Sequence, residues 1–506
     1  MIRTVLYTVV LVSCLTGGLL GSGWPVQPDS SVHKVSALFG TYLENPGNPP
    51  FMHSGIDIEV PFGTPVYAIK SGYVKTVMTR PPGEMGYSMW RVFIGDSAGT
   101  IPCEAIMYAH LVESSIPYFV PDQWVEEGEL IGLVVNWSNP DIIIHLHMSI
   151  VRYQGTWQDW ADGWDYWVYS GNPLDMIDII DDSDLPYFDN ALGDQLFAFC
   201  DNNGSTYFSE EGTISGEVDI VCAAYDAYHS YHWKNIPYMI EYKIEGDSSI
   251  PWTVSTYFTE PTGTYTEMSD YVSVIYQDDA VCNTSFGSEQ FFYFNLTNTN
   301  SDTVVEQSDT NFCWQTTYFH DGNYTVFARA TDKGGNSIVD SMIVTLDNHL
   351  ELSGVVSFGD GNPYDVSAYI SVEPDGAYDT TDIDGNFLLS NVGGGTQTII
   401  FSRAGYETVD TVLMMIQNRN LNVTMNPASY ACGNIDNETG SGGPVDIADL
   451  TYLVNYLFIA GSEPPIQAAA NVDGIIGSGG PIDIADLTYF VAYLFLGGPE
   501  SVCDGR

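Results

Sequence analysis

Hydrophobic and polar residues alternate over most of this chain in the manner of β-strands. In its first third, short runs rich in Val, Ile, Tyr and Thr, separated by Gly and Pro, predict strands at residues 64–69, 73–77, 91–94 and 142–150. From residue 185 to about 350 the alternation continues. There, residues 321–332 and 341–346 predict two strands joined by a hairpin turn at Gly334-Gly335-Asn336. We therefore expect a mainly β, multidomain chain built of antiparallel sheets.

The C-terminal part, residues 429–506, departs from this pattern because it contains a tandem repeat. Residues 445–452 recur as residues 482–489, and the Asn-x-Asp at 434–436 recurs at 471–473, so both matches have an offset of 37. The second half of each copy has helical periodicity, with Leu450, Leu453, Val454 and Leu457 on one face of the first copy. The repeat therefore predicts two copies of a loop followed by an α-helix.

Length and charge restrict the class of protein. The chain has 506 residues, more than one hydrophobic core usually serves, so several domains are expected. Fourteen Lys and Arg residues against 65 Asp and Glu residues give a formal net charge of −51. This charge argues against a nucleic acid partner and against an anionic membrane surface. A hydrophobic fraction of 44% and an aromatic fraction of 13% exclude a disordered chain.

Residues 1–23 have the features of a secretion signal. A basic start at Arg3 precedes an apolar run from Val5 to Leu20, and small residues follow. The same run contains Leu11-Val12-Ser13-Cys14, which resembles a lipobox and would leave the chain lipid-anchored at Cys14. We expect a secreted or cell-surface protein and favour free secretion, because the apolar run continues past Cys14. No later run reaches the ~20 apolar residues that span a bilayer, so no membrane span is expected.

Cysteine usage fits an oxidising compartment. Eight cysteines are present, and removal of a signal containing Cys14 would leave seven. Three bridges are suggested by proximity or by the way two cysteines bracket one unit, namely Cys200–Cys222, Cys282–Cys313 and Cys432–Cys503. Cys103 is then the odd residue.

Four histidines and one aspartate suggest a hydrolytic metal site. A zinc site that catalyses hydrolysis needs three protein ligands and an open position. His53 and Asp57 would supply two of the ligands, and His145 or His147 the third. Because residues two apart in a strand point to the same side, His145 and His147 would enter one cleft, where one binds metal and the other handles protons. His110 is a further candidate.

Four blocks of residues, in chain order, resemble the lysostaphin-type (LytM-like) zinc endopeptidases. They are His53-x-Gly55-Ile56-Asp57, Gly63-Thr64-Pro65-Val66-Tyr67-Ala68 followed by Gly72-x-Val74, Tyr108-Ala109-His110-Leu111, and His145-Leu146-His147. The resemblance covers residues 33–178. It implies an antiparallel β-sheet peptidase domain, with His53, Asp57 and His147 as zinc ligands. It also implies that His110 and His145 are the catalytic pair beside the metal.

This resemblance implies a secreted zinc metalloendopeptidase that hydrolyses peptide bonds in peptidoglycan stem peptides or cross-bridges. Two departures affect the walls of the cleft. Ile143-Ile144 precede the His145-Leu146-His147 block and Met148-Ser149 follow it, and residues 80–86 look lengthened. Two alternatives stay open: a wall-binding or adhesive protein that holds peptide without cutting it, and a secreted protease for glycine-rich proteins.

The rest of the chain resembles three further kinds of module. Residues 185–350 resemble an immunoglobulin-like sandwich, residues 351–428 a carboxypeptidase regulatory-like sandwich, and residues 429–506 a dockerin repeat, whereas residues 24–184 hold the peptidase-like part. The dockerin resemblance implies a cohesin-like partner and calcium, although a calcium-bound terminal domain without a partner is the alternative. The implied calcium ligands are Asn434, Asp436, Asp446, Asp449, Asn471, Asp473, Asp483 and Asp486.

Overall fold

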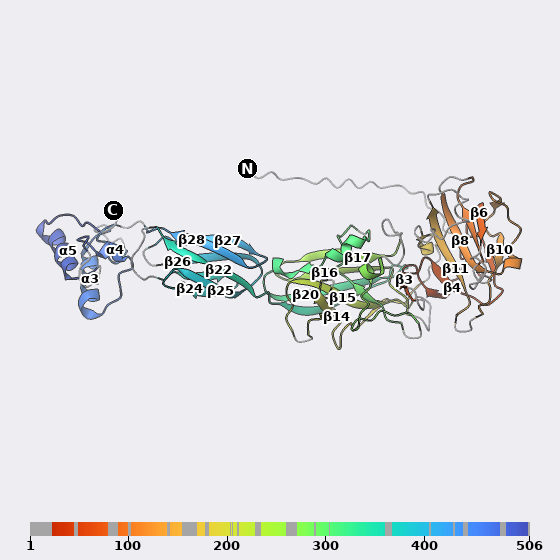
Figure 1. The fold of residues 1–506 in the computed structure, drawn as a ribbon, viewed down its shortest axis with the longest axis horizontal. Coiled ribbons are helices and arrows are strands. Elements are labelled where there is room, and N and C mark those ends of the chain that lie inside the picture. The colour runs from red at the N-terminus through yellow and green to blue at the C-terminus, as the bar shows by residue number, and fades with distance from the viewer. Residues whose placement is uncertain are drawn as a thin grey trace. The chain divides into compact units, whose positions relative to one another are not determined.

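The structure is a computed structural model of the chain (Figure 1). It describes residues 23–44, 49–78, 90–99, 103–138, 142–153, 170–177, 182–202, 204, 206–209, 212–227, 234–259, 271–287, 290–302, 304–359, 367–403, 406–428, 431–438, 444–475 and 482–503. The expected signal with its lipobox, the lengthened segment at 80–86 and the glycine-rich stretches of the two C-terminal loops lie outside these residues. Two compact units are distinguished. The first holds 1–212, 217–314 and 324–344, and the second holds the rest.

The first unit begins with an eight-stranded antiparallel sheet, in which β11 (His145–Tyr153) lies between β4 (Ile56–Glu59) and β8 (Cys103–Leu111) (Figure 1). Two small sheets accompany it, β2 (Tyr42–Leu43) with β3 (Phe51–Met52) and β5 (Pro65–Tyr67) with β10 (Leu130–Leu133). The order of the large sheet is β1 (Val35–Ala37), β4 (Ile56–Glu59), β11 (His145–Tyr153), β8 (Cys103–Leu111), β7 (Trp90–Gly95), β6 (Gly72–Met78) and β9 (Trp124–Val125), and β12 (Ser170–Gly171) pairs with β11.

The four strands predicted in this region are confirmed, with shifted ends. The run predicted at 142–150 begins as a strand only at His145. Strand β8 has apolar residues on both faces and is almost fully buried from Ala105 onward. One face packs Phe93, Met107 and Val151 into a core. This buried core supports the ends of β4 and β11, which carry polar side chains.

The first unit continues into two further antiparallel sheets, joined by long connections and one short helix, α2 (Val272–Ile275). The hairpin predicted across 321–346 is confirmed, because β20 (Gly322–Thr331) and β21 (Ser337–Leu346) are neighbours in one sheet. The backbone N–H of Asp332 donates to the carbonyl oxygen of Asn336 across the turn. One sheet has the order β13 (Tyr187–Asp189), β15 (Glu217–Tyr225), β14 (Phe197–Asp201), with β18 (Tyr293–Asn295) and β19 (Trp314–Gln315) also paired to β15. The other has the order β17 (Ile250–Tyr257), β16 (Met239–Glu245), β20 (Gly322–Thr331), β21 (Ser337–Leu346).

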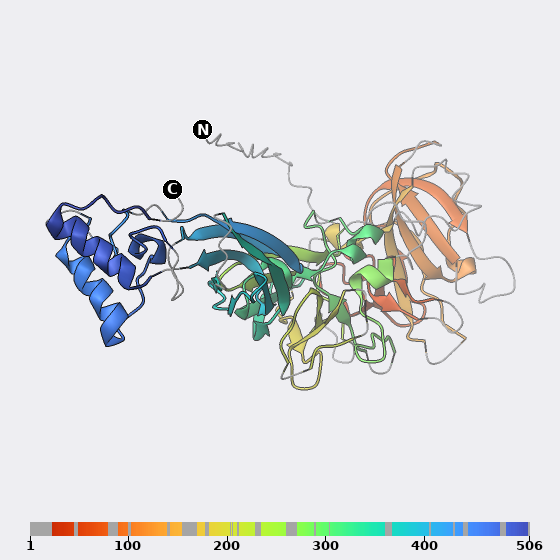
Figure 2. The same cartoon turned by 60° about the vertical axis from the view of Figure 1, so that its left-hand side comes forward.

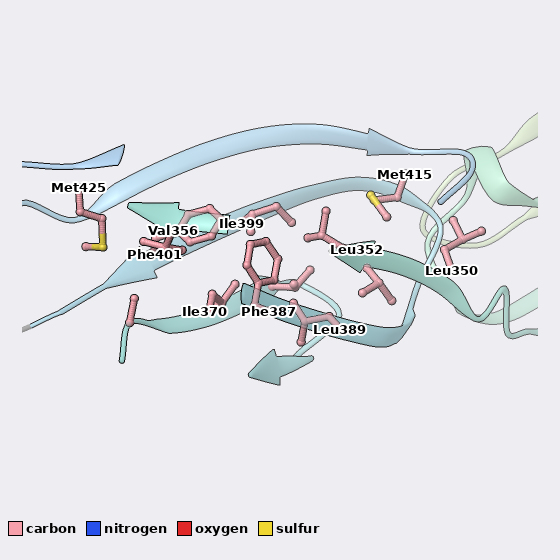
Figure 3. Packing of buried hydrophobic residues seen from close by; sticks show 13 residues of the cluster. Leu350, Leu352, Val356, Ile370, Phe387, Leu389, Ile399, Phe401, Met415 and Met425 are labelled. Carbon is pink, nitrogen blue, oxygen red and sulfur yellow. The ribbon is translucent and has the colours of Figure 1, made fainter. Parts of the chain in front are cut away.

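Two facing sheets form the part of the second unit between residues 350 and 425. Figure 3 shows Leu352, Phe387 and Ile399 directed into the space between them, and the rings of Phe387 and Phe401 meet edge to face at 5.6 Å. Thirteen buried side chains make up this core. The sheets are β25 (Asn386–Val392), β22 (Leu350–Phe358), β28 (Arg419–Met425), and β24 (Tyr378–Thr380), β23 (Tyr369–Glu373), β26 (Gly395–Ser402), β27 (Val409–Met415).

The tandem repeat of the sequence is confirmed by two matching helices at the C-terminal end, α3 (Ile447–Ile459) and α5 (Ile484–Leu496). They lie side by side in blue in Figure 2, with the short α4 (Gln467–Ala470) between them in sequence. Leu453 and Phe490 occupy their shared core. The predicted Cys432–Cys503 bridge is present, with Cα atoms 5.6 Å apart.

The other two predicted disulfides are wrong. Cys200 and Cys222 lie on paired strands, but Cys200 is opposite Asp219 and Cys222 is opposite Phe197. An odd offset of three residues puts the two side chains on opposite faces of the sheet, too far apart to bond. Cys282 is fully buried and its thiol donates a hydrogen bond to the carbonyl oxygen of Ala191, so no bridge to Cys313 forms.

Within the described part of the chain, no helix is both long and apolar enough to cross a membrane.

Candidate metal centre and active site

Three side chains converge at the end of the β4–β11 pair. The register places His147 directly opposite Asp57, and His53 precedes β4 by three residues. His53 Nε2 lies 3.0 Å from His147 Nδ1 and 3.2 Å from Asp57 Oδ1, and His147 Nδ1 lies 2.9 Å from Asp57 Oδ1. Four-coordinate zinc with bonds near 2.05 Å separates its ligand atoms by about 3.3 Å. The three atoms therefore already lie close to the positions that a tetrahedral zinc ion requires.

The remaining ring nitrogens of both histidines are held by neighbours. His53 Nδ1 lies 3.1 Å from the carbonyl oxygen of Leu38, to which it can only donate. His147 Nε2 lies 3.0 Å from Ser149 Oγ, and that hydroxyl donates to the carbonyl oxygen of Ser54 at 2.7 Å. Because the hydroxyl proton is committed to Ser54, Nε2 of His147 must be the donor. These contacts turn the lone pairs of His53 Nε2 and His147 Nδ1 toward Asp57, as partners of metal-binding histidines do.

Burial and charge favour the ionisation states that a metal requires. Burial alone would raise the pKa of the Asp57 carboxyl, but the surrounding side chains of His145, His53 and His147 hold that pKa well below its usual range. Burial lowers the pKa of His147 to about 4, against the opposing effect of Asp57. The site therefore combines a carboxylate with a neutral imidazole at neutral pH, and these are the forms that bind zinc.

His145 and His110 lie beside this triangle. The rings of His110 and His145 meet edge to face at 4.8 Å, and His110 is 5.8 Å from the His147 ring. His145 Nδ1 is 2.8 Å from the carbonyl oxygen of Ile143, so it donates there and leaves Nε2 as the atom able to accept a proton. His145 Nε2 lies 3.6 Å from Asp57 Oδ2. The structure thus brings all five predicted residues together.

His110 owes its position to an irregularity of its strand. The β7–β8 register pairs Trp90 with Leu111 but Arg91 with Ala109, so His110 is the extra residue of a bulge. Its φ of 65° lies in the left-handed region, which is rare for a residue other than glycine. Bulges re-aim side chains next to active sites. Here the bulge turns His110 toward the histidines of β11.

Two residues of the site were missed by sequence reasoning. Trp137 stacks on His145 with ring centroids 5.5 Å apart and meets His110 edge to face at 4.7 Å. No spacing in the sequence links Trp137 to the histidines. Ser149, in contrast, follows His147 by two residues in one strand. The alternation of side chains therefore could have identified it as a neighbour on the same face.

The eight candidate calcium ligands gather around the first turns of α3 and α5. Asp446 and Asp483 are the N-cap residues, each accepting a backbone N–H at 2.7 Å. Asp449 accepts the backbone N–H groups of Ile435, Asp436 and Asp446, and Asp486 accepts those of Asp473 and Asp483. In the described parts of these loops, no three aspartates bring carboxylate oxygens within 4.8 Å of one another.

Asparagine supplies the remaining candidates of these loops. Asn434 Oδ1 is buried and has no hydrogen-bond partner in the described part of the chain, whereas Asn471 Oδ1 accepts the backbone N–H of Ile475. The first copy of the repeat therefore keeps one buried oxygen atom uncommitted.

One protein-family model matches the part of the chain that contains the candidate site. Residues 51–160 match the model of peptidase family M23. Among solved structures, a zinc-containing peptidase from Vibrio cholerae is 22% identical at a TM-score of 0.21, over 27% of this chain and 38% of that one. The catalytic domain of lysostaphin from Staphylococcus simulans is 21% identical at 0.21, over 28% and 90%. LytU is 21% identical at 0.22, over 29% and 89%.

No curated protein matches the chain. The family match spans both halves of the site, from the block at His53 to the block at His147. Residues 51–160, which contain His53, Asp57 and His147, are therefore similar to peptidase family M23.

Proposed function

We propose that the first part of the chain, residues 24–184, is a zinc endopeptidase that hydrolyses peptide bonds in peptidoglycan stem peptides or cross-bridges. The observation that carries this proposal is the convergence of His53 Nε2, Asp57 Oδ1 and His147 Nδ1 within 3.2 Å of one another. His145 and His110 stand at the edge of that triangle. The family match at residues 51–160 supports the reaction class.

Each residue has a role that follows from its contacts. His53, Asp57 and His147 would hold the zinc ion, which when bound would polarise the substrate carbonyl and acidify water. His145 would take a proton at Nε2 and pass it to the leaving amine, since its Nδ1 is fixed by Ile143. His110, which meets His145 edge to face, would donate a hydrogen bond to the oxyanion that develops on the substrate.

The test separates metal binding from catalysis in the full chain. We expect about one zinc per chain in the wild type and in His145→Ala, and none in His147→Ala. Cleavage of peptidoglycan cross-links should be lost in both variants and on treatment with a zinc chelator. His349→Ala, which removes an exposed histidine paired with Asp347, is the matched control and should keep full activity. Zinc binding without cleavage of peptidoglycan or glycine-rich peptide would instead indicate a binding protein.

For the C-terminal repeat we propose two calcium-binding loops that present α3 and α5 to a cohesin-like partner. The support is the pair of matching caps and the buried, unpartnered Oδ1 of Asn434. Calcium titration of the full chain should show two more bound ions than titration of the double variant Asp436→Ala/Asp473→Ala. A cohesin module should bind in calcium and be released by a chelator. Binding that is unchanged in the double variant would reject the calcium loops.

We propose that residues 1–23 direct export of the chain, which gives a secreted or cell-surface protein. We also propose immunoglobulin-like and carboxypeptidase regulatory-like modules at 185–350 and 351–428. Mass spectrometry of the exported chain distinguishes free secretion from a lipid on Cys14, because only the lipid-anchored form starts at a modified Cys14.

A further inference from the structure

A second group of metal-ligating side chains lies outside the candidate active site, in the first unit. Asp182, Asp226 and Asp332 each offer a carboxylate oxygen, and these oxygens all lie within 4.8 Å of one another. Asp182 lies before β13, Asp226 directly follows β15, and Asp332 directly follows β20. Strands β13 and β15 belong to one sheet and β20 to the other. The three residues therefore meet where two sheets and an incoming segment come together.

Asp226 provides an independent sign that a ligand belongs here. The residue is 1% exposed, and its Oδ1 has no hydrogen-bond partner among the residues that the structure describes. Leaving a buried carboxylate oxygen unsatisfied is costly. Burial, together with the charges of Asp182 and Asp332, raises the pKa of the Asp226 carboxyl well above its usual range. A cation would relieve both the missing contact and the repulsion.

Hydrogen bonds hold the other two aspartates in place around Asp226. Asn336 donates its backbone N–H to Asp332 Oδ1 and its side-chain amide to Asp332 Oδ2, each at 2.8 Å. The same amide donates to the backbone carbonyl oxygen of Asp182, and Asp182 Oδ1 accepts the backbone N–H of Asp184 at 3.0 Å. The carboxylates are thus positioned by their surroundings before any ion binds.

Lys333, which follows Asp332 in the sequence, does not neutralise the three carboxylates. Its ammonium group pairs with Asp175 and with the hydroxyl of Tyr238.

Three carboxylates with only oxygen ligands suit a hard divalent cation. Calcium–oxygen bonds of about 2.3–2.6 Å allow ligand oxygens to be separated by up to roughly 5 Å across the ion, so one calcium ion can contact all three carboxylates.

We propose that Asp182, Asp226 and Asp332 form a calcium site that joins the two sheets of the first unit to the segment entering β13. Asp226 also exchanges two backbone hydrogen bonds with Asn235, whose side-chain amide donates to the carbonyl oxygen of Val35 in β1. Strand β1 pairs with β4, which carries Asp57. The ion therefore stabilises the contact between these sheets and the edge of the peptidase sheet.

The test uses the full chain carrying Asp436→Ala and Asp473→Ala, so that the proposed calcium loops of the C-terminal repeat do not contribute. After chelation, calorimetric titration with calcium chloride should show one ion per chain. Adding Asp226→Asn should abolish that binding, whereas the exposed Asp194→Asn should leave it unchanged. This outcome does not depend on zinc or on peptidase activity, so it stands or fails separately from the proposed function.

Thermal unfolding gives a second test, because the effect of Asp226→Asn on the melting temperature should reverse between chelator and calcium. In chelator, Asp226→Asn should melt at a higher temperature than its parent chain, because one of three mutually repelling charges is gone. In calcium the order should reverse. If Asp226→Asn does not fold, Asp182→Asn in the loop replaces it. Absence of calcium binding in the parent chain, or equal binding by the Asp226→Asn chain, would overturn the proposal.

Discussion

At the scale of single residues, the candidate site depends on the partners that fix its histidines. Ser149 Oγ accepts from His147 Nε2 and donates to the carbonyl oxygen of Ser54, which leaves His147 Nδ1 as the atom facing Asp57. Removing such a partner typically costs a factor of 10–100 in metal affinity.

We therefore predict that Ser149→Ala weakens zinc binding by roughly 10- to 100-fold while the fold is kept. Competition against a chromophoric chelator measures this affinity. Ser337→Ala, at an exposed position of β21, is the control and should bind zinc as the wild type does. An unchanged affinity in Ser149→Ala would show that the hydroxyl does not orient His147.

Gly55 shows why the first block of the motif contains a glycine. A Cβ at this position would lie 2.2 Å from the carbonyl oxygen of Met148 and 2.4 Å from Ser149 Oγ. Strands β4 and β11 approach too closely for any side chain there. We predict that Gly55→Ala lowers the free energy of unfolding by about 1–3 kcal/mol and weakens zinc binding. Urea unfolding combined with zinc analysis checks this, and a variant as stable as the wild type would contradict the close approach.

At the scale of elements, the loop 38–41 connects His53, a proposed metal ligand, to the neighbouring sheets. His53 exchanges backbone hydrogen bonds with Gly40 and Thr41, each at 2.8 Å, and its ring contacts Leu38. Tyr276, just after α2, donates its hydroxyl to the carbonyl oxygen of Gly40 at 2.7 Å. The residues after the peptidase sheet thereby support the position of His53.

Tyr276→Phe should destabilise the chain by about 1–3 kcal/mol, because the carbonyl oxygen of Gly40 is left buried without this donor. It should also weaken zinc binding less than Ser149→Ala does, since the effect reaches His53 only through the loop. Chemical denaturation and the chelator competition measure the two effects. The exposed Tyr378→Phe is the control. Equal stability of Tyr276→Phe and wild type would reject the supporting role.

The stability of the C-terminal repeat should depend on pH through Asp486, in the first turn of α5. Burial raises the pKa of Asp486 from 3.8 to about 6, so the folded chain holds a proton that the unfolded chain has lost. Protonation of this carboxyl stabilises the folded repeat fully below pH 4, and the stabilisation is lost as the pH rises toward 6. The total loss in the free energy of unfolding is about 3 kcal/mol.

In chelator, we predict that the melting temperature of the repeat falls between pH 4.5 and 6.5. This fall should be smaller in Asp486→Asn, where Asp449, whose pKa is also raised by burial, remains, and it should be unchanged in the exposed Asp410→Asn. Scanning calorimetry across this pH range measures it. A melting temperature that rises in the wild type would mean that Asp486 is ionised when folded.

At the scale of the whole molecule, sequence patterns predicted what depends on local alternation and spacing. The strands around 73–77 and 91–94, the hairpin at 334–336 and both repeat helices are confirmed, because period-2 and period-3.6 patterns reflect which side chains are buried. All five site residues are brought together by the β4–β11 register and the bulge at His110.

Features that depend on contacts between distant segments were not predictable in this way. Trp137 and the group formed by Asp182, Asp226 and Asp332 come together only through the packing of separate loops. The wrong pairing of Cys200 with Cys222 has the same origin. Proximity in sequence does not reveal the strand register that puts their side chains on opposite faces.

The proposed zinc peptidase is tested most directly by a zinc titration of the full chain after removal of all metal. Release of new amino groups from peptidoglycan is followed as zinc is added back. We expect no cleavage without zinc, activity that rises until one zinc per chain is bound, and no activity at any zinc level for His145→Ala. Cleavage by the metal-free chain, or none at saturating zinc, would show that the chain is not a zinc-dependent peptidase.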